Sequence, residues 1–304
     1  MIAKKAQISN TICDTRIDQA FNIVVVIFCT LLVILLLYPL YFVVCASISN
    51  PSMVAKGKTL LYPVRLTTLG YEEIFKNRDI WIGYKNTIIY TVGGTFFSLL
   101  FTLPAGYALS RQDFAPRSVI MLLFTFTMFF SGGMIPTYLT VKLFGLTNTV
   151  WVMILPFCVS AYNLIICRTF FQSSIPKELL EASQLDGCTD LRFFVSIVLS
   201  VSKALISVIA LYYAVGYWNQ YFNALLYLTD ERMKPLQLVL REILMQSQVF
   251  ADGQSTSGAD ATIAQKADLI KFGVIIVSSL PVIIVFPFLQ KYFEKGVMIG
   301  SVKG

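Results

Sequence analysis

The sequence predicts an all-α integral membrane protein with six transmembrane helices in a single domain, residues 1–304. Of the 304 residues, 56% are hydrophobic and only 13% are charged; the mean hydropathy is +0.71. A water-soluble domain carries about 25% charged residues, so much of this apolar surface must face lipid. The apolar residues also form long runs, each close to the roughly 20 residues that a helix needs to cross a bilayer. The predicted spans are 21–46, 87–109, 118–141, 150–167, 204–228 and 272–289.

The first two runs carry features typical of membrane helices. Run 21–46 is too long for the apolar core of a cleavable signal peptide, so we expect it to remain as a span. Run 87–109 contains Gly93-Gly94, small residues that allow a second helix to approach closely. The two longest polar segments, 47–86 and 229–267, are predicted to be outer loops.

A polar segment, 174–203, lies between the fourth and fifth runs and predicts a helix, a glycine turn and a second helix. Pro176 suits the first turn of a helix, where its missing N–H would have no partner. Gly187 can supply the left-handed residue that ends this helix. Thr189 or Asp190 can cap the second one. From these residues alone, an amphipathic loop on the lipid surface is an equally good interpretation.

The residue spacing within this segment is similar to that of a known family motif. It reads Glu181-Ala182-Ser183, three residues, Gly187, nine residues, then Ile197-x-Leu199. This resembles the EAA loop, EAA-x3-G-x9-I-x-L-P, of ATP-binding-cassette (ABC) importer permeases. Ser183 stands where the family has its second alanine, and Ser200 where it has the proline. The resemblance implies the type I importer permease fold, in which segment 174–203 is a cytoplasmic coupling loop that contacts the ATP-binding subunits through Glu181, Ala182, Ser183, Asp186 and Gly187.

Other segments resemble the carbohydrate branch of that family. These are 130–171 and 210–228, together with the tail 290–304, which looks like the ending of the maltose-type second permease subunit. In the family this cytoplasmic tail reaches the ATPase interface, which implies a coupling role for Gly300 and Gly304. A frayed end is the alternative.

The resemblance also implies a set of partners. These are a second homologous permease, two ATP-binding subunits, an extracytoplasmic solute-binding protein, an oligosaccharide substrate and the lipid bilayer. Loop 229–267 is implied to touch the binding protein. It begins with an amphipathic helical pattern and continues as a Gly/Ser/Thr-rich stretch, so a solvated linker is an equally good interpretation.

The residues argue against an enzyme. The chain has no histidine, which removes His-based acid–base catalysis and His metal sites. Gly57-Lys58-Thr59 is not a P-loop, because Ser52 stands where the first glycine is required. We therefore expect no catalytic residue, metal or cofactor in this chain, with ATP and Mg²⁺ bound by the partner ATPase. The basic residues are scattered over all loops, so we expect no nucleic-acid partner.

Sugars are bound by stacked aromatic rings and by amide or hydroxyl hydrogen bonds. The fifth run ends in a cluster of this kind, and the fourth carries one amide. The predicted substrate-pathway residues are Asn163, Trp218, Asn219, Tyr221 and Asn223. On a continuous helix the last four would offer a ring and two amides along one edge. Anchoring at the membrane interface is the alternative.

Together these features predict a permease subunit of an oligosaccharide importer in the bacterial plasma membrane. Lys and Arg divide evenly, 12 on each side, so charge gives no orientation; the resemblance places both termini in the cytoplasm. An ion-coupled secondary carrier is the alternative of another class. Such carriers usually place acidic residues in the bilayer, and the six runs contain none. An ABC permease for a non-sugar solute is the other alternative.

Overall fold

The computed structural model describes residues 16–251, 270–284 and 287. The chain divides into two compact units, 1–67 and 68–304. All the secondary-structure elements among the described residues are helices. The one β-bridge among these residues is an isolated antiparallel pair, Ser49 and Leu66. The tail 290–304 and residues 252–267 of the predicted outer loop lie outside the described residues.

The first unit is a long apolar helix followed by a short folded loop. Helix α1 (Arg16–Ser47) contains the whole predicted span 21–46. After it, Asn50 caps α2 (Pro51–Ala55) by accepting a hydrogen bond from the Ser52 N–H. The Tyr41 hydroxyl donates to the Leu61 carbonyl over 2.6 Å, which fastens the loop to the end of α1.

The second unit is built along α4 (Arg78–Ser110), which follows α3 (Leu69–Lys76) and contains the predicted span 87–109. Small residues allow its neighbours to come close, as the Gly93-Gly94 pattern predicted. A Cβ on Gly94 would lie 2.5 Å from the Tyr217 ring, and one on Gly106 would lie 2.7 Å from Cys167 Cβ. Helix α4 therefore positions both α7 (Ala161–Ser174) and α11 (Lys203–Trp218).

Three predicted runs are not single helices. Run 118–141 forms two helices, α5 (Arg117–Phe129) and α6 (Met134–Leu143), and the chain bends by 120° between them. Gly133 lies between them with φ +87°, a left-handed value that glycine adopts without strain. An apolar run specifies contact with lipid or with a core, but it does not specify an unbroken helix.

The other two runs are interrupted as well. Run 150–167 contains a short 3₁₀ helix, η1 (Val150–Met153), and the start of α7. Pro156 lies between them, and a proline within a helix removes one backbone hydrogen bond. Run 204–228 breaks after Trp218 and resumes as α12 (Phe222–Tyr227).

Within the described residues, two helices, α1 and α4, are long and apolar enough to cross a membrane. The number rises to four if each bent pair counts as one span. The sixth predicted run, 272–289, overlaps the apolar helix Ile270–Ile284. The count of six membrane crossings therefore stays a prediction.

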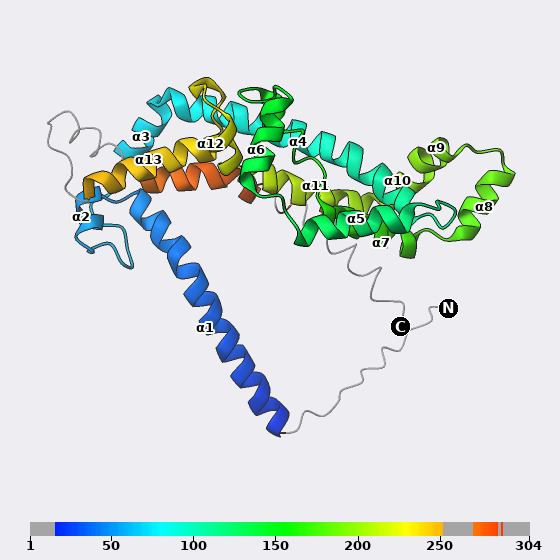
Figure 1. The fold of residues 1–304 in the computed structure, drawn as a ribbon. Coiled ribbons are helices and arrows are strands. Elements are labelled where there is room, and N and C mark those ends of the chain that lie inside the picture. The colour runs from blue at the N-terminus through cyan, green and yellow to red at the C-terminus, as the bar shows by residue number, and fades with distance from the viewer. Residues whose placement is uncertain (1–15, 252–269, 285–286, 288–304) are drawn as a thin grey trace, which may run out of the picture. The chain divides into compact units, whose positions relative to one another are not determined.

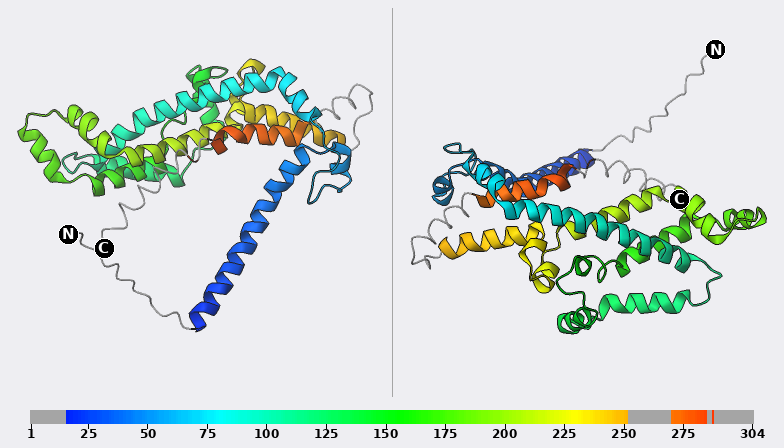
Figure 2. Two further views of the ribbon diagram at one scale, coloured as in Figure 1. Left: turned by 180° about the vertical axis from the view of Figure 1, so that it is seen from behind. Right: turned by 90° about the horizontal axis from the view of Figure 1, so that it is seen from above.

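The first part of the predicted outer loop is folded against α4. After η3 (Glu231–Met233) comes α13 (Leu236–Ala251), which confirms the amphipathic helix expected there. Its residues Leu236, Leu240 and Ile243 are buried against the helix Ile270–Ile284 and the start of α4. Figure 1 shows α3 and α13 at one end of this unit and α8 and α9 at the other, and both views of Figure 2 agree.

Candidate functional site

The segment 174–203 has the predicted helix–turn–helix form, and we call it the coupling loop. Its first helix is α8 (Lys177–Leu185), and Pro176 stands just before it as the N-cap. Gly187 has φ +73°. Its N–H donates to the Gln184 carbonyl and the Cys188 N–H donates to the Ser183 carbonyl. This pair of bonds is a Schellman motif, so Gly187 ends α8 as predicted.

The second half of the coupling loop is a composite helix. Thr189 is the cap of α9 (Asp190–Phe193), and its Oγ1 accepts a hydrogen bond from the Arg192 N–H. The chain continues as a π-helical turn, η2 (Phe194–Val198), and then as α10 (Leu199–Val201). A bend of 83° separates this composite helix from α11.

The five predicted coupling residues of this loop divide by exposure. Glu181, Ala182, Asp186 and Gly187 are exposed, whereas Ser183 is buried and its hydroxyl donates to the Leu180 carbonyl over 2.7 Å. Serine in place of the family's alanine is thus accommodated by one internal hydrogen bond. The other two, Gly300 and Gly304, lie outside the described residues.

Two exposed leucines flank the glycine turn. Leu185 is 90% exposed and Leu191 is 74% exposed. Two exposed leucines beside one turn make this end of the loop a candidate contact surface for another chain. The sequence pattern of α8 alone does not separate Leu185 from Leu180, which packs against the core.

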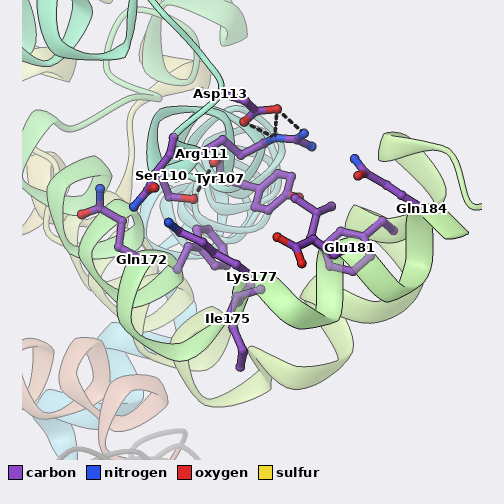
Figure 3. Close-up of a pocket in the computed structure, with 14 residues that line it drawn as sticks. Tyr107, Ser110, Arg111, Asp113, Gln172, Ile175, Lys177, Glu181 and Gln184 are labelled. Carbon is purple, nitrogen blue, oxygen red and sulfur yellow. Dashed lines mark hydrogen bonds and ion pairs between the residues drawn. The ribbon is translucent and has the colours of Figure 1, made fainter.

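A cleft of about 350 Å³ lies between α8 and the end of α4. Figure 3 shows Glu181 and Gln184 on one side of it and Tyr107 and Arg111 on the other. Arg111 is the cap residue at the C-terminal end of α4, where the helix dipole favours a positive charge.

Arg111 is also the centre of an ion-pair network. Its Nη1 donates to Asp190 Oδ1 over 2.6 Å, while Nε and Nη2 donate to the two carboxylate oxygens of Asp113. The hydrogen bonds with Asp113 raise the pKa of Arg111 above its ordinary value and lower the pKa of the Asp113 carboxyl. Local sequence patterns do not reveal this network, because 79 residues separate Arg111 from Asp190.

A second pocket, of about 330 Å³, lies along one side of α11 where it faces the start of α7. Its lining is aromatic, hydroxyl and amide, and it carries no charged side chain among the described residues. The lining residues are Phe157, Ser160, Asn163, Tyr212, Tyr213, Gly216, Tyr217, Gln220 and Asn223. The buried Oε1 of Gln220 has no hydrogen-bond partner within the described residues. Such an atom favours a ligand or a water molecule that can donate to it.

Hydrogen bonds to α4 hold two of the tyrosines that line this pocket. The Tyr213 hydroxyl bonds Thr102 Oγ1 over 2.7 Å, and the Tyr217 hydroxyl lies 3.2 Å from Ser98 Oγ. Tyr213 also accepts a hydrogen bond from the Ser160 N–H. The pocket wall is therefore tied to α4.

The structure does not bring the five predicted substrate-pathway residues together. Asn163 and Asn223 line the pocket. Trp218 is only 7% exposed and packs in the cluster formed with α13. The amide of Asn219 donates to the Val215 carbonyl one turn earlier, and the exposed Tyr221 ring lies under the Arg241 guanidinium. The expected continuous helix through these residues was wrong, because α11 ends at Trp218.

Residues 80–299 match the family described as "Binding-protein-dependent transport system inner membrane component". The chain belongs to this family. The match covers more than two thirds of the sequence and confirms both the ABC permease resemblance and the expectation of a transport component rather than an enzyme.

Relatives of this permease are matched over nearly their whole length. It is 39% identical over 287 residues to the polygalacturonan/rhamnogalacturonan transport system permease protein YtcP of Bacillus subtilis, covering 94% of this chain and 99% of the relative. It is 27% identical to the arabinooligosaccharides transport system permease protein AraQ of the same species, covering 94% and 97%.

A solved structure confirms the fold. The permease is similar, with a TM-score of 0.83 and 31% identity, to a chain in the crystal structure of a bacterial ABC transporter involved in the import of the acidic polysaccharide alginate. The match covers 92% of this permease and 98% of that chain. The permease therefore has the fold of an ABC importer membrane subunit.

Proposed function

We propose that this chain is one of two homologous permease subunits of an ABC importer that moves oligosaccharides across the bacterial plasma membrane. An extracytoplasmic binding protein delivers the sugar. Two ATP-binding subunits hold ATP and Mg²⁺ and dock on the coupling loop, so this chain needs no cofactor of its own. In this arrangement the coupling loop and both termini are cytoplasmic, and the tail with Gly300 and Gly304 reaches the ATPase interface.

The main support for the proposal is that α7 and α11 connect the second pocket with the coupling loop. Asn163 lines the pocket from the first turn of α7, and this helix ends at Ser174, where the loop begins. The loop ends at Lys203, where α11 begins, and Tyr217 near the other end of α11 lines the pocket. A displacement of the loop therefore moves two walls of the pocket.

The chemistry of the pocket fits a sugar. Amide and hydroxyl groups from Asn163, Gln220 and Asn223 can bond sugar hydroxyls, and the tyrosine rings can lie against the C–H faces of a pyranose. The names of the relatives, which include polygalacturonan and arabinooligosaccharides, support an oligosaccharide substrate. Because the described lining is uncharged, a carboxylate on the substrate would need a cation from another chain.

The outer side carries a preformed surface for the binding protein. Asn148 Oδ1 accepts hydrogen bonds from the N–H groups of Thr229 and Asp230. The Asn86 amide donates to the carbonyls of Arg232 and Lys234. A loop fixed in this way loses little conformational entropy when a partner docks, which favours the docking interpretation of segment 229–236 over a solvated linker.

The test uses the complex of two permease and two ATP-binding subunits in proteoliposomes. Labelled saccharides of one to four units are delivered by the saturated binding protein. Asn163→Ala removes a pocket amide worth about 1–3 kcal/mol, so at about 1.4 kcal/mol per decade we expect uptake to fall by a factor of about 5 to 100. Asn219→Ala removes the same chemistry from outside the pocket. A loss confined to Asn219→Ala would place the sugar on the helix edge predicted from sequence, and full uptake in both variants would remove this chain from the pathway.

A further inference from the structure

We infer that Arg111 is a positioning residue that transmits displacement of the coupling loop to α4. This inference rests on the proposed docking of the loop with the ATP-binding subunits. The routes through α7 and α11 follow the chain itself, whereas Arg111 provides a third route that only the folded structure reveals. It joins the end of α4 to the first residue of α9 through the bond to Asp190.

The geometry of Arg111 fits a fixed link. Asp113, two residues away, binds Nε and Nη2 and so holds the planar guanidinium in one orientation. Nη1 is thereby directed at Asp190. The Arg111 side chain is 15% exposed, while Asp113 and Asp190 are 62% and 67% exposed. Exposed ion pairs contribute little to the free energy of unfolding. We therefore assign this pair a role in fixing the position of Asp190 relative to the end of α4. A lysine cannot bind both carboxylates with this fork geometry.

Aromatic packing also joins the segment 190–194 to the end of α4. The cleft of about 350 Å³ lies on one side of the link and a groove of about 440 Å³ on the other, and both are lined by Tyr107, Arg111 and Asp113. Between them, the Tyr107 ring packs on Phe193 and Phe194 with centroid distances of 6.4 and 5.2 Å. These rings are part of the buried core, and the charge-assisted hydrogen bond adds a directional polar link beside them.

The backbone behind α9 is suited to movement. The π-helical turn η2 and the 83° bend before α11 separate α9 from the next long helix. π-Helical turns are weaker points of a helix and recur at functional sites. A push on α9 is therefore partly absorbed before α11 but passes directly through Asp190 and Arg111 into α4. From there it reaches the pocket through the bonds of Ser98 and Thr102 to the two tyrosines.

The test compares Asp190→Asn, Arg111→Lys and the charge swap Arg111→Asp with Asp190→Arg in the reconstituted four-subunit complex. The readout is sugar transported per ATP hydrolysed, alongside basal ATP hydrolysis. We expect the single variants to keep basal hydrolysis and to lose at least about fivefold in sugar per ATP, and the swap to recover at least half of the wild-type ratio. Asp79→Asn, the same change of an exposed aspartate at the opposite end of α4, should leave the ratio unchanged.

A second measurement separates this inference from the proposed function. A cysteine in place of the exposed Leu185 should cross-link to a cysteine-scanned ATP-binding subunit in the wild-type background and in Asp190→Asn. If the cross-link forms and Asp190→Asn has the wild-type ratio, the role of Arg111 is wrong while the docking stands. If no cross-link forms in either background, the docking itself is wrong.

Discussion

The indole Nε1 of Trp218 donates to the carbonyl of Ser278 over 3.2 Å, which ties the end of α11 to the helix Ile270–Ile284. Trp218 therefore packs in the buried cluster with α13, which favours a structural role over the predicted role of stacking on a sugar. The two roles make opposite predictions for its variants.

Trp218→Phe should keep most of the packing and lose the hydrogen bond, which costs about 1 kcal/mol. Trp218→Ala should cost about 3 kcal/mol or more, because it also leaves a cavity. The thermal unfolding midpoint of the purified complex measures both. Sugar transported per ATP should stay at the wild-type value in Trp218→Phe, and a tenfold fall at unchanged stability would return Trp218 to the substrate pathway.

Gly187 allows a test of the coupling loop that changes no contact. A Cβ at this position would meet nothing within 4 Å, and φ is +73°. The cost of Gly187→Val is therefore confined to the backbone, about 1–2 kcal/mol. Gly187→Asn should be tolerated, because asparagine adopts the left-handed region more readily. We expect substrate-stimulated ATP hydrolysis to fall in the valine variant only; equal rates in the two variants would show that the Schellman turn is not needed for coupling.

Alanine substitutions at Gly94 and at its neighbour Gly93 test how closely α4 packs against other helices. A Cβ on Gly94 would penetrate the Tyr217 ring at 2.5 Å, whereas one on Gly93 would meet the end of the Ile154 side chain at 3.1 Å. Gly94→Ala should cost about 1–3 kcal/mol and displace Tyr217 from Ser98, and Gly93→Ala should cost less. Thermal unfolding of both variants provides the comparison. The reverse order would mean that Tyr217 can move aside freely.

The exposed Leu185 should contribute to docking without contributing to folding. Leu185→Ser removes apolar surface from a side chain that is 90% exposed. Burial of a leucine side chain contributes about 1.5–3 kcal/mol, so affinity for the ATP-binding subunits should fall at least tenfold. Titration of the isolated ATP-binding subunit onto the permease pair in detergent measures this. Unchanged affinity together with an unchanged helical circular dichroism signal would show that Leu185 faces solvent in the complex.

The parts that could be predicted from sequence are those set by local chemistry. The Schellman turn at Gly187, the cap at Thr189 and the amphipathic α13 each depend on a few neighbouring residues, and the structure has all three. The close approach at Gly94 was also predictable, since a glycine in a membrane helix has few other uses.

The parts that could not be predicted depend on contacts between distant segments or on breaks within apolar runs. Hydropathy cannot distinguish one straight helix from α5 and α6, because the residues on both sides of the break are similarly apolar. The break after Trp218 places Asn163 and Gln220 in one pocket and excludes Trp218 from it. The Arg111–Asp190 bond leaves no local pattern in the sequence at all.

The most direct test of an ATP-driven sugar importer is the energy source for uptake. Proteoliposomes with the four-subunit complex receive ATP on the side of the coupling loop and the sugar-loaded binding protein on the other, with and without ionophores that abolish proton and sodium gradients. We predict that sugar accumulates only with hydrolysable ATP and that ionophores do not change the rate. Accumulation that follows an imposed ion gradient without ATP, and stops with the ionophore, would contradict the proposed function and favour an ion-coupled carrier.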